Sequence, residues 1–286
     1  MDKRNGVKPL QEFELVRENV SYHGYKAVSE KRLGVIAFIH GIGEHFGRYK
    51  ELSEYMAKQG YSVYGVDLPG HGKSPGIRGH VGRRSDLYKL IDTFIDYVAR
   101  EEMGSPIFLM GHSMGGNITL SYRIARDRAS VKGYIASSPW IRLVKPPTML
   151  AYGLSIVASV ILPEKQLKSG VKREKAFHPG SLIPPSAKPD KLCHPFITPG
   201  TIAGCLKWAK IILKETDIDR PPILLMHGTR DGICSVEGSR EFAAAAGKLC
   251  TYREWEGLRH DMINEECRKD IADEILTWLE LNRLRG

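Results

Sequence analysis

A ten-residue stretch at 107–116, I-F-L-M-G-H-S-M-G-G, constrains the fold of this 286-residue chain more than any other. Its first half is apolar like a buried strand, and its second half has the pattern G-x-S-x-G, in which a strand turns sharply into a helix around a central serine. Gly111 and Gly115 leave room for the turn, because a Cβ at either position would collide with neighbouring backbone. The turn pushes the hydroxyl outward, so the sequence predicts Ser113 as a nucleophile at the end of a strand.

The composition is typical of a globular protein with one large core. Hydrophobic residues make up 42% of the chain and charged residues 26%, and no internal repeat or low-complexity tract is found. The net charge of +9 is accompanied neither by a nucleic-acid-binding motif nor by aromatic residues interleaved with basic ones. Nucleic acid is therefore not an expected partner.

Cysteine usage and the first residues bear on the compartment. The five cysteines are odd in number and none lies in a C-x-x-C pair, which argues against a disulfide framework and against a structural zinc site. The start of the chain lacks the apolar region of a secretory signal, and the longest apolar run is too short to span a bilayer. We therefore expect a cytoplasmic protein that at most touches a membrane surface.

Alternating strand and helix patterns predict an α/β fold with a doubly wound, mostly parallel sheet. A leading antiparallel hairpin is expected over 12–28. The short apolar strands expected of a sheet covered on both faces lie at 34–40, 61–68, 106–110, 131–137 and 222–227, with a further strand at 251–257. Helical patterns lie at about 49–59, 84–100, 116–128, 235–246 and 266–283.

The stretch 140–220 breaks this rhythm, because a simple crossover between two strands needs far fewer residues. We expect a core formed by 1–139 and 221–286, with 140–220 inserted as a helical cap. Within the insertion, 148–162 is apolar almost without interruption. Two interpretations of this segment stay open: a wall for an acyl chain, with Leu154 and Ile161 contacting the substrate, or a helix wholly buried against the core.

A basic run follows the apolar segment, at 165–175. Basic residues next to an apolar helix are suited to anionic lipid headgroups. Transient contact of the cap with a membrane surface is therefore an open expectation.

A serine hydroxyl needs a base to take its proton, and the imidazole that serves as base needs a carboxylate to orient it. Asp231 follows the strand at 222–227, and His260 follows the strand at 251–257. Both therefore fall on loops at the same edge of the sheet as Ser113, in the chain order Ser, Asp, His that accompanies this serine turn. The sequence predicts a Ser113, Asp231, His260 triad.

Other carboxylates compete with Asp231 as the acid of the triad. They are Asp67, Asp217, Asp261, Glu265 and Glu266. The last three flank His260 and precede the final helix, where acidic groups favour the helix dipole. Asp231 is retained because it comes directly after a strand of the sheet.

Acyl transfer also requires donors that point at the developing oxyanion, and two backbone N–H groups supply them in enzymes with this serine turn. One belongs to the residue after the nucleophile, Met114. The other is expected in the glycine-rich turn after the strand at 34–40, where residues 40–45 read H-G-I-G-E-H. Ile42 is the predicted second donor.

Three motifs together resemble one family. H-G-I-G-E-H-F-G-R-Y at 40–49, D-L-P-G-H-G-K-S-P-G at 67–76 and G-H-S-M-G-G at 111–116 are similar to the monoglyceride lipase and lysophospholipase group of α/β-hydrolases, over nearly the whole chain. The resemblance implies the α/β-hydrolase fold and maps its triad and oxyanion hole onto the five residues named above. It also makes His71 a packing and hydrogen-bonding residue. The chain departs from the family at 194–198, H-P-F-I-T, where relatives often read D-P-L.

The sequence therefore predicts a serine ester hydrolase that needs no cofactor and no metal and acts on a monoacylglycerol or lysophospholipid. A carboxylesterase for short-chain or aryl esters is the alternative on the same machinery. A catalytically idle binding protein is a third reading, but it would not need all three triad residues and both oxyanion turns. Cys234 is expected to be a small buried residue beside the acid loop, and the oligomeric state is not indicated.

Overall fold

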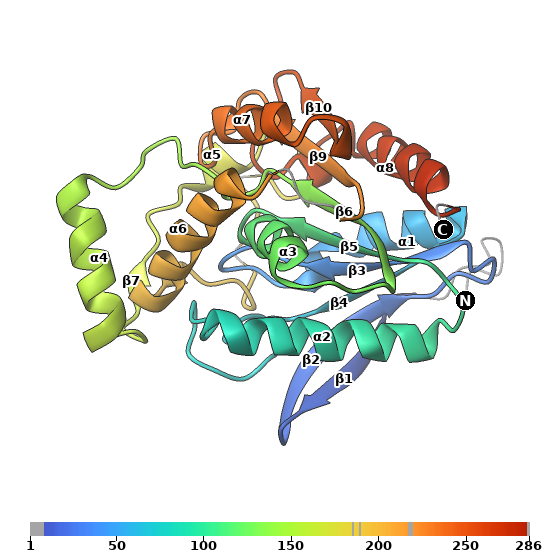
Figure 1. Ribbon diagram of the computed structural model, residues 1–286, viewed down its shortest axis with the longest axis horizontal. Helices are drawn as coiled ribbons and strands as arrows, with labels where there is room; N and C mark the ends of the chain where they lie inside the picture. Colours follow the sequence, from blue (N-terminus) through green and yellow to red (C-terminus); the bar gives the residue numbers. More distant parts are fainter. Residues whose placement is uncertain (1–8, 185, 189, 217–219, 285–286) are drawn as a thin grey trace.

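The structure is a computed structural model that describes residues 9–184, 186–188, 190–216 and 220–284. These residues form an eight-stranded sheet in the order β1-β2-β4-β3-β5-β6-β9-β10 (Figure 1). Its strands are β1 (Gln11–Arg17), β2 (Val20–Ala27), β3 (Gly34–Ile39), β4 (Tyr61–Val66), β5 (Ile107–His112), β6 (Val131–Ser137), β9 (Ile223–Gly228) and β10 (Cys250–Trp255). Strand β2 is antiparallel to β1 and β4, and the other pairs are parallel.

Helices cover both faces of this sheet, as the apolar strands predict. They are α1 (Lys50–Gln59), α2 (Arg84–Glu101), α3 (Met114–Ala125), α7 (Val236–Ala246) and α8 (Arg268–Asn282), with short 3-10 turns η1 (Phe46–Tyr49), η2 (Gly247–Leu249) and η3 (Met262–Asn264). One hydrophobic cluster joins the sheet to α2, α3 and α7, and the other joins it to α1 and α8. Every residue of β3, β4, β5 and β9 is buried between these layers.

The predicted fold class is confirmed: the sheet order, the leading hairpin and the alternation of strands and helices are those of an α/β-hydrolase. Helix ends differ from the prediction by a few residues. Helix α3 begins at Met114, directly after the serine turn, and the last helix begins at Arg268, after η3 and a short turn at 265–267. Helix ends are the least predictable part of a periodic pattern.

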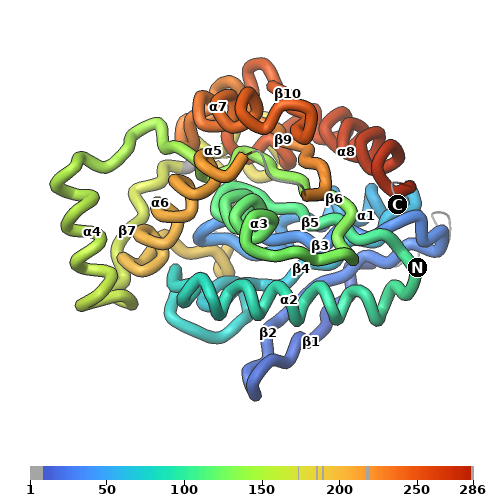
Figure 2. The backbone as a smooth tube through the Cα atoms, in the orientation of Figure 1, coloured from blue at the N-terminus to red at the C-terminus, as the bar shows by residue number. Residues whose placement is uncertain are grey.

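Between β6 and β9 the chain leaves the sheet, runs out to α4 at one end of the molecule and returns through α6 (Figure 2). This segment contains α4 (Met149–Ile161), β7 (Leu167–Lys168), α5 (Arg173–Ala176), β8 (Phe196–Ile197) and α6 (Pro199–Lys214). Helix α6 packs into the core cluster of α2 and α3 through Cys205, Trp208 and Ile212. Helix α4 packs against α6 instead, and no helix among the described residues is long and apolar enough to cross a membrane.

The interpretation of 148–162 as a wholly buried helix is wrong. None of the residues of α4 is buried. The helix carries no charged residue, and its main packing partner is α6. The apolar composition of α4 alone therefore does not indicate what covers the sides of the helix that face away from α6.

Candidate active site

Strand β5 ends in a sharp turn that presents the Ser113 side chain at the edge of the sheet. Ser113 adopts φ +56° and ψ −117°, a left-handed backbone conformation that is costly for a residue with a side chain. A Cβ at Gly111 would collide with the carbonyl of Gly115, and one at Gly115 with the carbonyl of Ile39. The two glycines are thus required by the close approach that the sequence predicts.

Ser113, His260 and Asp231 lie in a continuous hydrogen-bonded row. The distance from Ser113 Oγ to His260 Nε2 is 2.9 Å, and that from His260 Nδ1 to Asp231 Oδ2 is 2.7 Å. Asp231 follows β9 and His260 follows β10, so neighbouring parallel strands bring them to the serine. With the Nδ1–H donating to Asp231, Nε2 is free to accept the serine proton.

Asp231 and a protonated His260 stabilise each other's charge. Burial lowers the pKa of His260, but the nearby charge of Asp231 and the hydrogen bond between them outweigh burial and raise it above its ordinary value. Burial of Asp231 acts to raise its pKa, and the charge of His260 together with a hydrogen bond from His227 lowers it well below its usual range. At neutral pH Asp231 is therefore ionised and can support a protonated His260.

His227 is a member of this network that the sequence analysis did not identify. Its Nε2–H donates to Asp231 Oδ2 at 3.1 Å, and its Nδ1 accepts from Ser239 Oγ at 2.7 Å. The other carboxylate oxygen of Asp231 accepts the backbone N–H groups of Ile233 and Cys234, at 2.7 and 2.9 Å. The available signal was that His227 ends the strand before the acid, which places it on the same edge of the sheet.

The rival acids have other partners. Asp67 accepts the backbone N–H groups of Phe46 and Lys73, both at 2.9 Å, and so joins two turns of the core. Asp261 pairs with Arg48, with 2.9 Å between Oδ2 and Nη2, and Glu265 accepts the backbone N–H of Arg259. Glu266 lies beside Gly180 of the insertion. Asp217 lies outside the described residues.

The glycine-rich turn at 40–45 lies directly against the serine. A Cβ at Gly41 would be 3.2 Å from Ser113 Cβ. The buried carboxylate of Glu44 holds the turn, because its Oε1 accepts the Gly41 N–H at 2.5 Å and the Tyr49 hydroxyl at 2.7 Å. Ile42 lines the cavity around Ser113, and Met114 is the first residue of α3. Their predicted role as oxyanion donors fits these positions.

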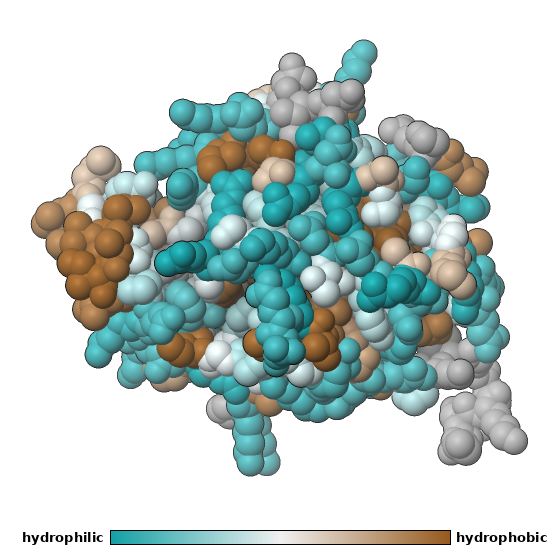
Figure 3. Space-filling model, turned by 60° about the horizontal axis from the view of Figure 1, so that its bottom comes forward, coloured by the Kyte–Doolittle hydropathy of each residue, from teal (hydrophilic) through white to brown (hydrophobic). Residues whose placement is uncertain are grey.

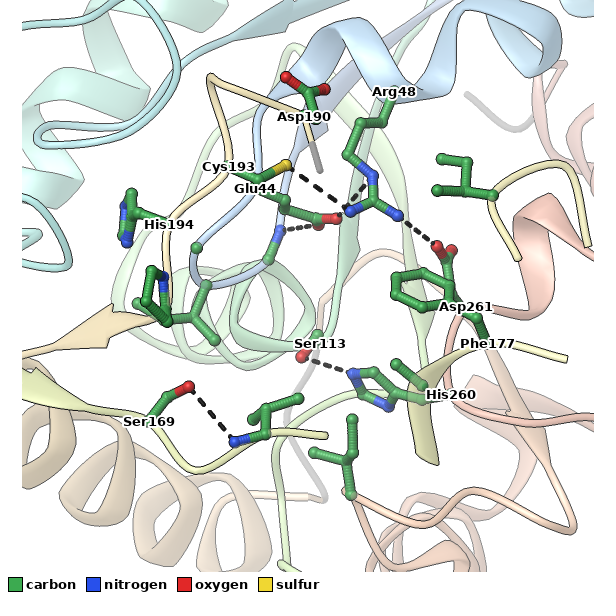
Figure 4. A pocket seen from close by; sticks show the side chains of 18 of the residues that line it. Glu44, Arg48, Ser113, Ser169, Phe177, Asp190, Cys193, His194, His260 and Asp261 are labelled. Carbon is green, nitrogen blue, oxygen red and sulfur yellow. Dashed lines mark hydrogen bonds and ion pairs between the residues drawn. The ribbon is translucent and has the colours of Figure 1, made fainter. Parts of the chain in front are cut away.

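Ser113 opens into a cavity of about 380 Å³. Its walls come from the turn at 40–45, from the ends of the strands and from residues of the insertion between Ser169 and Phe196. In Figure 4, Glu44, Arg48, Asp190 and Cys193 gather on one side of the cavity. The remaining wall is largely apolar, and its larger apolar side chains are Ile42, Val171, Phe177, Ile183, Phe196 and Ile233. The cavity thus offers a polar side and an apolar side to one ligand.

Arg48 organises the polar side. Its guanidinium lies 2.9 Å from Asp261 Oδ2, 3.6 Å from Glu44 Oε2 and 3.8 Å from Cys193 Sγ. Burial acts to lower the pKa of Arg48, but the charges of Glu44 and Asp261 outweigh burial and raise it above its ordinary value. Glu44 and Arg48 belong to the motif at 40–49, but the motif alone did not indicate a role for either residue.

Leu154 and Ile161 do not line this cavity, contrary to the expectation from the sequence. Their exposed fractions are 60% and 68%, and both lie on α4 at the outer edge of the molecule. The reason is that α6, not α4, lies over the core. The apolar wall is supplied instead by short loop segments of the insertion, which no hydrophobic periodicity marks.

Two minor expectations agree with the structure. His71 is fully buried, and its Nδ1–H donates to the carbonyl of Pro69 at 2.9 Å, which is the packing role expected for it. Cys234 is 1% exposed, and burial is the main reason that its thiol pKa lies well above the ordinary value.

Comparisons with known proteins show which family this chain resembles. Residues 30–267 match the family model described as serine aminopeptidase, S33. The chain is 29% identical over 249 residues to phospholipase YtpA of Bacillus subtilis, which covers 85% of this chain and 93% of that protein. It is 27% identical over 252 residues to an abhydrolase domain-containing protein of Dictyostelium discoideum, of which it spans only 26%. The crystal structure of the Paleococcus ferrophilus monoacylglycerol lipase superimposes with a TM-score of 0.80 and 32% identity, covering 91% of this chain and 99% of that one.

Proposed function

The chain belongs to the serine aminopeptidase S33 family of α/β-hydrolases, and we propose that it hydrolyses the ester bond of a monoacylglycerol through an acyl-enzyme formed on Ser113. The observation that carries this proposal is the row Ser113, His260, Asp231, with its 2.9 and 2.7 Å contacts at the bottom of a cavity that is polar on one side and apolar on the other. The names of the phospholipase and the monoacylglycerol lipase reported above support a lipid ester as substrate.

The reaction begins when His260 Nε2 takes the proton of Ser113 Oγ as that oxygen attacks the ester carbonyl. The carbonyl oxygen becomes an oxyanion, which the backbone N–H groups of Ile42 and Met114 stabilise. His260 then gives the proton to the leaving glycerol oxygen, and the bond between carbonyl carbon and glycerol oxygen breaks. Water attacks the acyl-enzyme with His260 as base, which releases the fatty acid and restores Ser113.

Asp231 and His227 support this proton transfer without touching the substrate. Asp231 fixes the His260 ring with its Nδ1–H directed away from the serine, and its charge stabilises the imidazolium that forms. His227 and two backbone N–H groups fix the carboxylate in turn. The chemistry requires no metal and no cofactor.

The charge of the polar side favours a neutral headgroup. The charged side chains that line the cavity are the cations Arg48 and Lys188 and the carboxylates Glu44, Asp190 and Asp261. Arg48 is already paired with two of the carboxylates. A phosphate would meet this net negative wall at a cost, whereas glycerol hydroxyls find both donors and acceptors. A monoacylglycerol therefore fits this side better than a lysophospholipid with an anionic head.

Helix α4 supports transient contact with a membrane surface as part of this function. Most of its large apolar side chains are exposed, and Figure 3 shows a hydrophobic cluster at the end of the molecule where α4 stands in Figure 1. The exposed lysines Lys165, Lys168 and Lys172 follow it in the chain. Apolar side chains next to basic ones are the composition of helices that lie in the interface of an anionic bilayer.

The test is a headgroup and chain-length series on purified protein. We expect 1-acylglycerols to be turned over faster than lysophosphatidic acid of the same acyl chain, and long acyl chains to be preferred over acetyl esters. Turnover of short aryl esters alone would favour the carboxylesterase alternative. Ser113→Ala is the control for background hydrolysis and should be inactive on every substrate.

A further inference from the structure

His194 joins the insertion to two loops of the core. Its backbone N–H donates to the carbonyl of Gly43 at 2.9 Å, in the turn that carries Ile42. Its ring Nε2–H donates to the carbonyl of Gly70 at 3.1 Å, in the loop after β4. The other ring nitrogen, Nδ1, accepts the N–H of Phe196 at 3.3 Å and so shapes its own turn. One residue therefore bonds to two loops of the core and to its own turn.

The fit of the Gly43 turn against this residue is close. Gly43 has φ +72°, and a Cβ there would collide with the carbonyl oxygen of His194. The turn at 40–45 thus packs on the backbone of His194, with no space for a side chain between them. A shift of residue 194 would have to displace the turn.

The His194 ring also continues a row of tilted imidazole rings into the core. Its centroid is 4.8 Å from that of His71, and His71 is 5.3 Å from His40. The ring of His40 donates from Nδ1 to the carbonyl of Gly41, in the same oxyanion turn, and accepts the Leu68 N–H. This row of rings therefore contacts the turn at 40–45 a second time, through His40.

The bonds of the His194 ring require a neutral imidazole, with a proton on Nε2 only. Burial lowers the pKa of His194 to about 4, with a further contribution from the charge of Arg78. Burial also lowers the pKa of His40 and of His71. The three rings are thus neutral at pH 7, as the hydrogen bonds of His194 and His40 require.

We propose that His194 is a positioning residue for the oxyanion hole: its ring, bonded to Gly70 and packed against His71, fixes the backbone that holds Gly43, and through it the N–H of Ile42. This inference rests on the proposed function, because it assumes that Ile42 serves the oxyanion. It assigns a role to the position at which the sequence departs from the related family. Oxyanion donors act by preorganisation, so a small displacement of the turn reduces turnover more than it reduces substrate binding.

Two amide replacements separate the two ring contacts of His194. The side-chain nitrogen of Gln reaches about as far as Nε2, so His194→Gln can still donate to Gly70, while Asn is too short. The side-chain oxygen of Asn instead replaces Nδ1 as acceptor for the N–H two residues on. If His194 positions the oxyanion turn through Gly70, His194→Gln retains activity and His194→Asn loses it. A role confined to the local turn gives the opposite order.

A matched control exists in the same insertion. His178 Nδ1 accepts the N–H of Gly180 at 3.2 Å, the same local contact that His194 makes with Phe196, but its side chain is half exposed. The His178→Ala variant should keep wild-type kinetics. His194→Ala removes the local contact together with the long-range ones and should not.

The measurements are kcat and KM on a soluble ester, and the affinity for a trifluoromethyl ketone, whose tetrahedral adduct with the serine carries an oxyanion. We expect His194→Ala and His194→Asn to lose about tenfold in kcat and about tenfold in ketone affinity, with KM within about twofold, and His194→Gln to stay within about twofold of wild type. Melting temperatures are measured alongside.

Three results would overturn the inference: unchanged kcat in His194→Ala, a loss that falls on KM alone, or Asn retaining activity while Gln loses it. If His194→Ala does not fold, the comparison of Gln with Asn still decides. Failure of the proposed function would look different, because the wild-type protein itself would then neither hydrolyse esters nor bind the ketone.

Discussion

Helices α3 and α4 have nearly the same length, 12 and 13 residues, but opposite environments. Ten residues of α3 are buried, although Asn117 and Arg123 are among them, whereas α4 has no charged residue and no buried one. Helix α3 follows directly from β5 and lies between the sheet and α6, while α4 has α6 as its main neighbour. The comparison shows that the covering elements, and not the apolarity of a helix, decide what it buries.

The largest expected effect concerns the acid that the core positions. Asp231→Asn should lower kcat by a factor on the order of 10⁴, because the imidazole is then held in the wrong tautomer. The fold should persist, because the new side chain has the same shape. Steady-state kinetics with a soluble ester measure the loss, and near-normal activity would assign the role of the acid to another residue.

The next effect compares the two helices directly. Ile118 on α3 is fully buried, and Leu154 on α4 is 60% exposed. Ile118→Ala should reduce the free energy of unfolding by about 2–5 kcal/mol, through lost burial and a cavity, and Leu154→Ala by less than about 0.5 kcal/mol. Denaturant unfolding of both variants measures this. Equal losses would mean that α4 is covered in the folded protein.

A smaller effect tests what covers α4. The double variant Leu154→Asp with Val160→Asp should lower hydrolysis of a monoacylglycerol in anionic vesicles by about tenfold or more, because each apolar side chain buried in the interface contributes about 1.5–3 kcal/mol. Rates on soluble C4 and C12 esters should not change. Leu281→Asp, an equally exposed site on α8, is the control, and equal losses in that variant would exclude a specific role for α4.

The smallest effect is in the pH profile. His260 must be neutral to accept the serine proton, so kcat/KM should fall as pH decreases through its pKa, which lies above the ordinary value of 6.5. Burial alone would lower that pKa, and the charge of Asp231 raises it. In Asp231→Asn the acid limb should therefore move to lower pH. An acid limb that moves to higher pH would mean that the charge of Asp231 does not raise the pKa of His260.

The same contrast explains what the sequence could predict. The ends of parallel strands converge on one edge of the sheet, so the alternation of strands and helices and the places of Ser113, Asp231 and His260 after their strands followed from short local patterns. The position of α4 did not follow, because it depends on how the whole insertion lies over the core. His227 and the pairs of Arg48 were missed for a related reason: their partners are set by side-chain packing between distant segments, and local periodicity carries no such information.

Labelling with a fluorophosphonate probe tests the central claim most directly. An activated serine attacks the phosphorus by the same route that it uses on an ester carbonyl, so the wild-type protein should be labelled at Ser113, as read by peptide mass spectrometry. Ser113→Ala should give no labelling, and Asp231→Asn should label far more slowly. Undiminished labelling of Ser113→Ala, or wild-type protein that does not react while correctly folded, would contradict the account.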